Sequence, residues 1–176
     1  MVRYRRNFVP GGTFFFTVTL ADRRSSVLVD HIVALRAAFR VTRSEQPFAI
    51  DAIVVLPDHL HTIMTLPPDD CDFSGRWRRI KSLFTRRVAA QDKTRKQNGE
   101  HALWQPRFWE HTVRDETDFA RHADYIHYNP VKHGLVTCAR DWPFSSFHHY
   151  VKQGLLPEDW GGGVNDGGSD FGERKA

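Results

Sequence analysis

The most informative chemical signal in the sequence is a pair of histidines, His59 and His61, separated by Leu60. Side chains alternate between the two faces of a strand, so both imidazoles would point to one face of a sheet while Leu60, Met64 and Leu66 point to the other. Two imidazoles on one rigid face can share a metal ion. The same pattern also fits histidines that are satisfied in a core or that face solvent. A metal site therefore requires a third ligand and a reaction to serve.

A later helical segment offers both. Tyr125 and Asn129 are four residues apart and are neighbours on one helix face if the helix persists that far. An amide oxygen is a ligand for hard divalent cations. A tyrosine hydroxyl can attack phosphorus to give a phosphotyrosine ester, although its ordinary pKa of about 10 means that it needs help at neutral pH. Spacing alone also fits a Tyr125 that only packs, and Tyr128 is a rival nucleophile.

The elements that must position these residues follow from the apolar patterns. In chain order we expect a strand at 13–20, a helix at 29–43, strands at 48–56 and 60–66, a helix at 73–90, a strand at 108–113 and a helix from 115 to about 128. Pro130 is expected to end the last helix, because the residue before a proline avoids the helical region. The resulting order is that of an α+β, ferredoxin-like antiparallel sheet with an extra C-terminal helix. We expect a single domain over residues 1–150 and a partly flexible C-terminal tail over 151–176.

Composition sets wider limits on function. The 176 residues include 25 Lys and Arg against 21 Asp and Glu, and the pI is about 9.3, which favours a polyanionic partner without identifying it. An ordinary basic protein has the same balance. Cys71 and Cys138 lie far apart, which argues against a disulfide framework or a cysteine-built zinc site and fits a reducing cytoplasm. No segment approaches membrane-spanning length.

Four motifs in order resemble a known family. The segment 56–61 (LPDHLH) is similar to the histidine motif of the HUH endonuclease superfamily and its single-tyrosine transposases. The segments 104–111 (WQPRFWEH), 124–134 (DYIHYNPVKHG) and 141–147 (DWPFSSF) resemble the REP-associated tyrosine transposases. The similarity runs from about Arg3 to Trp160, and several separate motifs in the right order make it specific.

The resemblance implies a ferredoxin-like HUH fold and the cleavage and rejoining of single-stranded DNA beside REP-like palindromic hairpins. Tyr125 matches the family nucleophile, which forms a 5′-phosphotyrosine link and releases a 3′-hydroxyl, and His59 and His61 match the metal ligands. Asn129 stands where insertion-sequence relatives have glutamine as the third ligand. Two imidazoles alone would suit zinc, but the phosphoryl transfer, the amide ligand and the family favour Mg²⁺ or Mn²⁺.

This reading predicts a single-stranded DNA hairpin as the partner, bound by a monomer. It places the protein in the bacterial cytoplasm, associated with the nucleoid and with no membrane involved. Cationic side chains neutralise phosphates and aromatic ones stack on unpaired bases. The DNA-binding candidates are Arg3, Arg5, Arg6, Lys81, Arg107, Trp109, Lys132 and His133. Two rival readings remain, a hairpin-binding protein or regulator that does not cleave, and a metal hydrolase whose nucleophile is water.

Overall fold

The computed structural model describes residues 7–91 and 102–161. Its elements, in chain order, are β1 (Thr13–Thr19), α1 (Val27–Asp30), α2 (Ile32–Glu45), β2 (Ala49–Val55), β3 (His59–Thr65), α3 (Phe73–Gln91), β4 (Trp109–Thr112), α4 (Glu116–Lys132), the short 3-10 helix η2 (Ala139–Asp141) and α5 (Phe147–Lys152). The β-α-β-β-α-β order predicted from the sequence is therefore confirmed, and most boundaries lie within one or two residues of those expected.

The four strands form one antiparallel sheet in the order β2-β3-β1-β4. The two central strands, β3 and β1, pair along their whole length from Thr13↔Thr65 to Thr19↔His59. This strand order is that of a ferredoxin-like fold, in which the first and third strands are central. The histidine pair therefore lies on a central strand, where the backbone is held on both sides.

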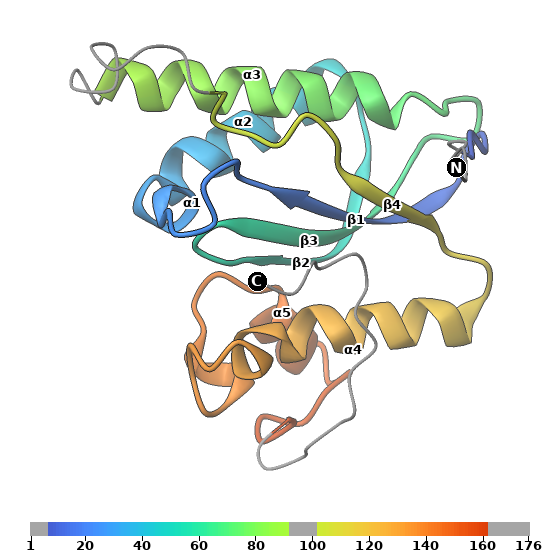
Figure 1. Ribbon diagram of the computed structural model, residues 1–176. Helices are drawn as coiled ribbons and strands as arrows, with labels where there is room; N and C mark the ends of the chain where they lie inside the picture. The colour runs from blue at the N-terminus through green and yellow to red at the C-terminus, as the bar shows by residue number, and fades with distance from the viewer. Residues whose placement is uncertain (1–6, 92–101, 162–176) are drawn as a thin grey trace, which may run out of the picture.

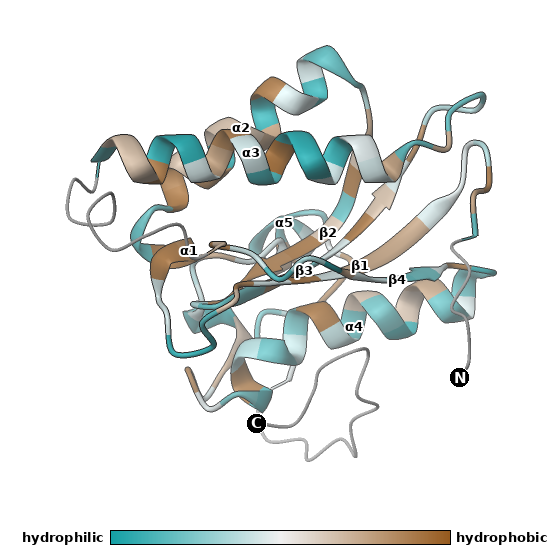
Figure 2. Ribbon diagram, turned by 45° about the horizontal axis from the view of Figure 1, so that its top comes forward, coloured by the Kyte–Doolittle hydropathy of each residue, from teal (hydrophilic) through white to brown (hydrophobic). Residues whose placement is uncertain are grey.

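The sheet has helices on both faces (Figure 1). Helices α2 and α3 cover one face, and α4 with α5 covers the other. The larger core lies under α2 and α3 and contains Phe14, Phe16 and Leu60, while Phe15 and Ile63 pack against α4 on the opposite face. Figure 2 shows the matching hydropathy, with many apolar residues along the central strands and alternating hydrophilic and apolar residues along the helices on either side.

Helix α4 extends farther than the sequence predicted, and the expectation that Pro130 ends it is wrong. The helix runs through Pro130 to Lys132. The chain leaves the helical conformation only at Gly134, two residues after Lys132, where φ is positive at 67°. The backbone N–H of Gly134 donates to the carbonyl of Val131, and that of Leu135 donates to the carbonyl of Pro130. This is a Schellman cap, so the glycine and not the proline sets the end of the helix. Tyr125 and Asn129 consequently share one continuous helix.

The helix expected at 29–43 is divided into α1 and α2, with His31 between them. The segment after α4 returns to the edge strand β2, where Val54 bridges to Ser145 and the N–H of Val55 donates to the carbonyl of Phe144. Helix α5 crosses residue 150, so the boundary expected there stays a prediction. Residues 162–176, most of the expected tail, lie outside the described residues. No helix in the described part of the chain is long and apolar enough to cross a bilayer.

Candidate active site

The two histidines lie on the α4 side of the sheet and are buried, with His59 2% and His61 0% exposed. Their rings are 5.0 Å apart, centroid to centroid. Leu60 and Met64 point to the opposite core, as the alternation predicted. Each imidazole has its Nδ1 atom held by a neighbour: His59 Nδ1 lies 2.8 Å from Asp58 Oδ1, and His61 Nδ1 lies 2.9 Å from Thr17 Oγ1. When Nδ1–H donates in these bonds, the nitrogen with which each ring would bind a metal ion is Nε2.

Asp58 is the anionic support of His59. Burial raises the pKa of its carboxyl, but the hydrogen bond and positive charge of His59, together with the charge and hydrogen bond of Arg23, outweigh burial and lower that pKa overall. Arg23 Nε lies 2.5 Å from Asp58 Oδ2. The carboxylate therefore stays ionised and holds the His59 ring in one orientation.

Helix α4 begins at the N-cap residue Asp115. The Asp115 side chain accepts a hydrogen bond of 2.8 Å from the backbone N–H of Asp118, and Glu116 and Asp118 place negative charge in the first turn, where the helix dipole favours it. The buried face of the helix carries His122, Tyr125 and Asn129. This face packs on the strand that carries the histidines.

Tyr125 lies directly against the histidine pair. Its ring is 5.2 Å from that of His61, and the side chain is 8% exposed. The Nζ of Lys132 lies 3.3 Å from the Tyr125 hydroxyl and 4.8 Å from the ring centroid. His133, just after the helix, has its ring 5.2 Å from that of His59. The site thus combines a phenol, an ammonium and imidazoles within one cluster.

The rival Tyr128 lies elsewhere on the helix. Its ring is 6.5 Å from Trp160, in the segment that follows α5. The ring of Tyr125, by contrast, lies against that of His61. The third proposed ligand, Asn129, is fully buried one turn beyond Tyr125 on the same face. Two imidazoles and an amide oxygen form a donor set that suits a divalent metal ion.

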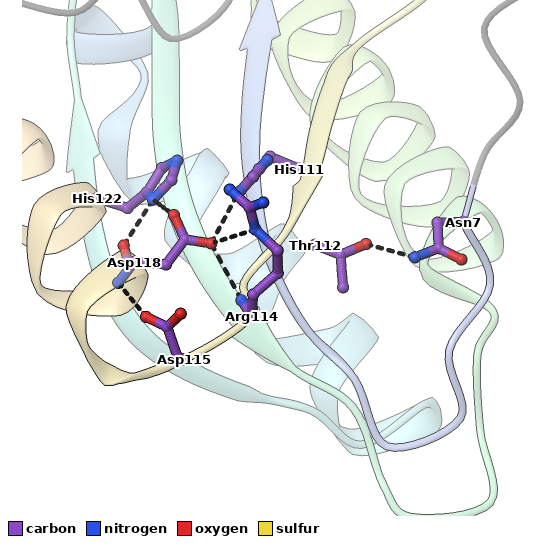
Figure 3. Close-up of polar contacts among 7 residues, drawn as sticks. All are labelled: Asn7, His111, Thr112, Arg114, Asp115, Asp118 and His122. Atoms are coloured by element: carbon purple, nitrogen blue, oxygen red, sulfur yellow. Dashed lines mark hydrogen bonds and ion pairs between the residues drawn. The ribbon is translucent and has the colours of Figure 1, made fainter.

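A second polar cluster lies farther along the same face of the sheet (Figure 3). His111 of β4 and His122 of α4 both contact the carboxylate of Asp118, and ligand atoms of the three residues lie within 4.8 Å of one another, close enough to hold a metal ion. The rings of His111 and His122 are stacked at 4.6 Å with an angle of 18° between them. Nearly parallel rings direct their lone pairs along parallel planes, so joint coordination requires one ring to rotate.

Asp118 acts as an ion-pair hub in this second cluster. Burial raises the pKa of its carboxyl, but hydrogen bonds from His111 and from the backbone N–H of Arg114, with the charges of both histidines, bring that pKa down to about 2. His111 Nε2 and the Arg114 backbone nitrogen lie 2.8 Å and 3.0 Å from Asp118 Oδ2. The cluster connects the edge strand β4 to the first turn of α4, and Phe15 lies between His122 and His61, with ring distances of 4.8 Å and 5.5 Å.

The DNA-binding candidates are distributed unevenly. Lys132 and His133 adjoin the histidine site, whereas exposed Arg107 and Trp109 lie beside strand β1 on its other flank. Lys81 is not a free surface cation, because its Nζ donates to the carbonyl of Gln105 at 3.1 Å. The three N-terminal arginines, Arg3, Arg5 and Arg6, lie outside the described residues.

Two residues of the site were missed by sequence reasoning. Asp58 precedes His59 directly, and an acidic neighbour of a candidate ligand is a signal that could have been used. Thr17 carries no such signal, because its partnership with His61 depends on the pairing of β1 with β3.

A ferredoxin-like sheet with a buried His-x-His pair on its central strand, faced by a tyrosine on the covering helix, places a candidate nucleophile beside candidate metal ligands. Comparison with known proteins defines the family. Residues 15–129 match the family described as Transposase IS200 like. The chain is 49% identical over 166 residues to a REP-associated tyrosine transposase of Escherichia coli (strain K12), covering 94% of both chains. It is 48% identical over 166 residues to a Haemophilus influenzae protein named for the same class, covering 92% of this chain and 94% of the relative.

A solved structure of a REP-associated tyrosine transposase, described as bound to a REP hairpin, matches with a TM-score of 0.88 and 48% identity over 100% of this chain and 99% of that one. The chain therefore belongs to the REP-associated tyrosine transposases, within the IS200-like transposase family. It is accordingly a DNA-binding enzyme of the class that cuts and rejoins DNA. The family and the histidine clusters together point to a divalent metal ion.

Proposed function

We propose that the protein is a metal-dependent endonuclease and strand transferase that acts on single-stranded DNA beside repetitive palindromic hairpins, through a 5′-phosphotyrosine at Tyr125. The observation that carries the proposal is the packing of Tyr125 against His61, at 5.2 Å between ring centroids. The hairpin substrate is supported by the related structure described as bound to a REP hairpin.

His59, His61 and Asn129 are the residues that would hold the metal ion. When bound, a divalent ion supplies Lewis-acid polarisation of the scissile phosphate. We propose Mg²⁺ or Mn²⁺, because an amide oxygen and phosphate oxygens are hard ligands. Tightly held zinc at His59 and His61, with no activation by Mg²⁺ or Mn²⁺, would contradict this assignment.

The side chains of this chain perform the remaining steps. Asp58 and Thr17 fix the orientation of the two imidazoles through their Nδ1 atoms. The Tyr125 oxygen forms a bond to phosphorus as the bond from phosphorus to the 3′-oxygen breaks; the phenolic proton is lost, and the departing 3′-oxygen takes up a proton to become a hydroxyl. Lys132, 3.3 Å from the Tyr125 hydroxyl, stabilises the negative charge on the attacking oxygen.

Rejoining is the same step in reverse. A DNA 3′-hydroxyl attacks the phosphotyrosine, the phosphodiester forms again and Tyr125 is released with a proton. The phosphodiester energy is conserved in the tyrosyl ester, so no nucleotide cofactor is needed.

One chain suffices in this proposal. His59 and His61 come from β3, and Tyr125 comes from α4 of the same chain. A site assembled within one protomer needs no exchange of helices between subunits, which supports a monomer. We propose that this monomer acts on DNA in the bacterial cytoplasm. We place this activity in a single domain over residues 1–150.

The proposal is tested with end-labelled hairpin oligonucleotides taken from palindromes that flank the gene, incubated with Mg²⁺ or Mn²⁺. The wild type should form a denaturation-resistant adduct that carries the 5′-phosphate side of the cut, and the Tyr128→Phe control should form it as well. Tyr125→Phe, His59→Ala and chelator should abolish it. Specific hairpin binding without an adduct would instead favour the non-cleaving DNA-binding protein, and hydrolysis that survives Tyr125→Phe would favour a metal hydrolase.

A further inference from the structure

A cavity lies beside the histidine site, where the edge of the sheet is interrupted. Leu20 bridges to Trp104, and three residues back along β1, Thr17 pairs with Trp109. Val18 and Thr19 of β1 therefore face four residues, 105–108, of the segment that leads into β4. The backbone N–H of Gln105 still donates to the carbonyl of Thr19 at 2.9 Å, so the residues that bulge away from β1 are 106–108. Beside the bulge lies an open cavity of about 420 Å³, lined in part by Thr17, Thr19 and Trp109.

The strand register places the floor of this cavity next to the proposed metal ligands. Thr17 pairs with His61, and Thr19 pairs with His59. Side chains of directly opposed residues point to the same face, with Cβ atoms about 5 Å apart. Trp109 pairs with Thr17 from the other side. His61, Thr17 and Trp109 therefore form one row across three strands, on the face that Tyr125 covers.

The lining of the cavity suits one kind of ligand. Trp109 is 41% exposed and offers a planar aromatic surface at the edge of the sheet. Arg107 supplies a positive charge, and the lining that the described residues form contains no acidic side chain. The two threonine hydroxyls and Gln105 provide hydrogen-bonding groups. An aromatic face, a cation and several polar groups together match an unpaired nucleotide, whose base stacks and whose phosphate is neutralised.

Lys81 of α3 holds the segment that lines the cavity in place before any ligand binds. Its Nζ donates to the Gln105 carbonyl at 3.1 Å and lies 5.6 Å from the Trp104 ring centroid and 5.7 Å from that of Phe108. These contacts hold the bulged segment from beneath. Lys81 is thus a positioning residue for the cavity rather than a phosphate contact.

We propose that this cavity binds the base of one unpaired nucleotide adjacent to the scissile phosphate, stacked on Trp109, with Arg107 on its phosphate. The proposal rests on the function proposed above and adds to it the part of the site that selects the position of the cut. A base held over β1, the strand next to that of His59 and His61, fixes which phosphodiester faces Tyr125.

The test uses single-stranded hairpin oligonucleotides in which 2-aminopurine replaces, one at a time, each unpaired base next to the hairpin. Stacking quenches 2-aminopurine, so one position should be quenched by the wild type. Trp109→Tyr should keep much of that quench, because its electron-rich ring still stacks, and Trp109→Ala should lose it, with hairpin binding weakened about tenfold. Arg107→Ala should weaken binding and flatten its salt dependence. Val33→Ala and Arg40→Ala, exposed on α2 across the sheet, should change neither.

An abasic substitution at the quenched position provides a second test. The abasic change should lower the hairpin affinity of the wild type about as much as the Trp109→Ala substitution does. It should lower the affinity of the Trp109→Ala variant little further, because both changes remove the same contact. Quenching identical in the wild type and Trp109→Ala at every position, with the covalent adduct still formed, would overturn the cavity proposal and leave the proposed function intact. Absence of the adduct in the wild type, with the Trp109-dependent quench present, would instead contradict the proposed function alone.

Discussion

Thr17 Oγ1 lies 2.9 Å from Nδ1 of His61, although the two residues are 44 positions apart in the sequence. The pairing of β1 with β3 creates this contact. A hydroxyl that accepts the Nδ1 proton fixes both the tautomer and the orientation of the ring, and this directs Nε2 toward the site where a metal ion would bind. His59 receives the same support from Asp58.

Replacing Thr17 with valine should weaken metal binding. The substitution keeps the branched shape but removes the hydroxyl, so we expect the affinity for Mn²⁺ to fall about tenfold. Isothermal titration calorimetry measures this directly. Thr19→Val, on the same face of the same strand, is the matched control and should bind Mn²⁺ like the wild type. Equal losses in the two variants would show that the Thr17 hydroxyl has no specific role.

Lys132 should affect the rate of adduct formation more than DNA binding. Lys132→Met removes the ammonium 3.3 Å from the Tyr125 hydroxyl, and the loss of one such charge-stabilising group is expected to slow the reaction about 100-fold. Lys132→Arg should recover most of the rate. Single-turnover adduct formation at saturating hairpin gives the rate, and Lys152→Met on α5 serves as the surface control. A Lys132→Met variant that binds the hairpin more weakly but forms the adduct at the normal rate would show that Lys132 only contacts a DNA phosphate.

The Asp118 hub predicts a specific acid sensitivity. The pKa of the Asp118 carboxyl is lowered to about 2 in the folded state, from about 4 in the unfolded chain. The ion pairs of Asp118 therefore contribute their full stability above about pH 4. This contribution is lost as the pH falls toward 2. Unfolding free energies measured by denaturant titration between pH 6 and pH 2.5 should therefore fall more steeply for the wild type than for Asp118→Asn. Glu116→Gln, exposed in the same helical turn, should follow the wild type. Parallel profiles for the wild type and Asp118→Asn would refute the assignment.

Periodicity was sufficient to predict the fold and part of the site. The alternation around Leu60 and Met64 indicated which face carries the histidines, and the helical spacing of Tyr125 and Asn129 indicated that they share a face. Both signals are local, because one strand or one helix determines them. The family motifs added the expectation that these two elements meet.

The rest of the site depends on long-range pairing that no local pattern encodes. Thr17 and Thr19 acquire their places beside His61 and His59 from strand register, and Trp109 joins the row through a second pairing. The end of α4 was misplaced for a different reason. The bias of a residue before proline competes with the Schellman cap at Gly134, and the cap prevails.

The most direct test of the account is to identify the residue that becomes attached to DNA. Trypsin should release a peptide from His122 to Lys132 that contains both Tyr125 and Tyr128. After nuclease trimming of the covalent complex formed with a hairpin oligonucleotide, fragmentation of this peptide by tandem mass spectrometry should place the nucleotide on Tyr125. A nucleotide on Tyr128, or no modified tyrosine in a reaction that has cut the DNA, would contradict it.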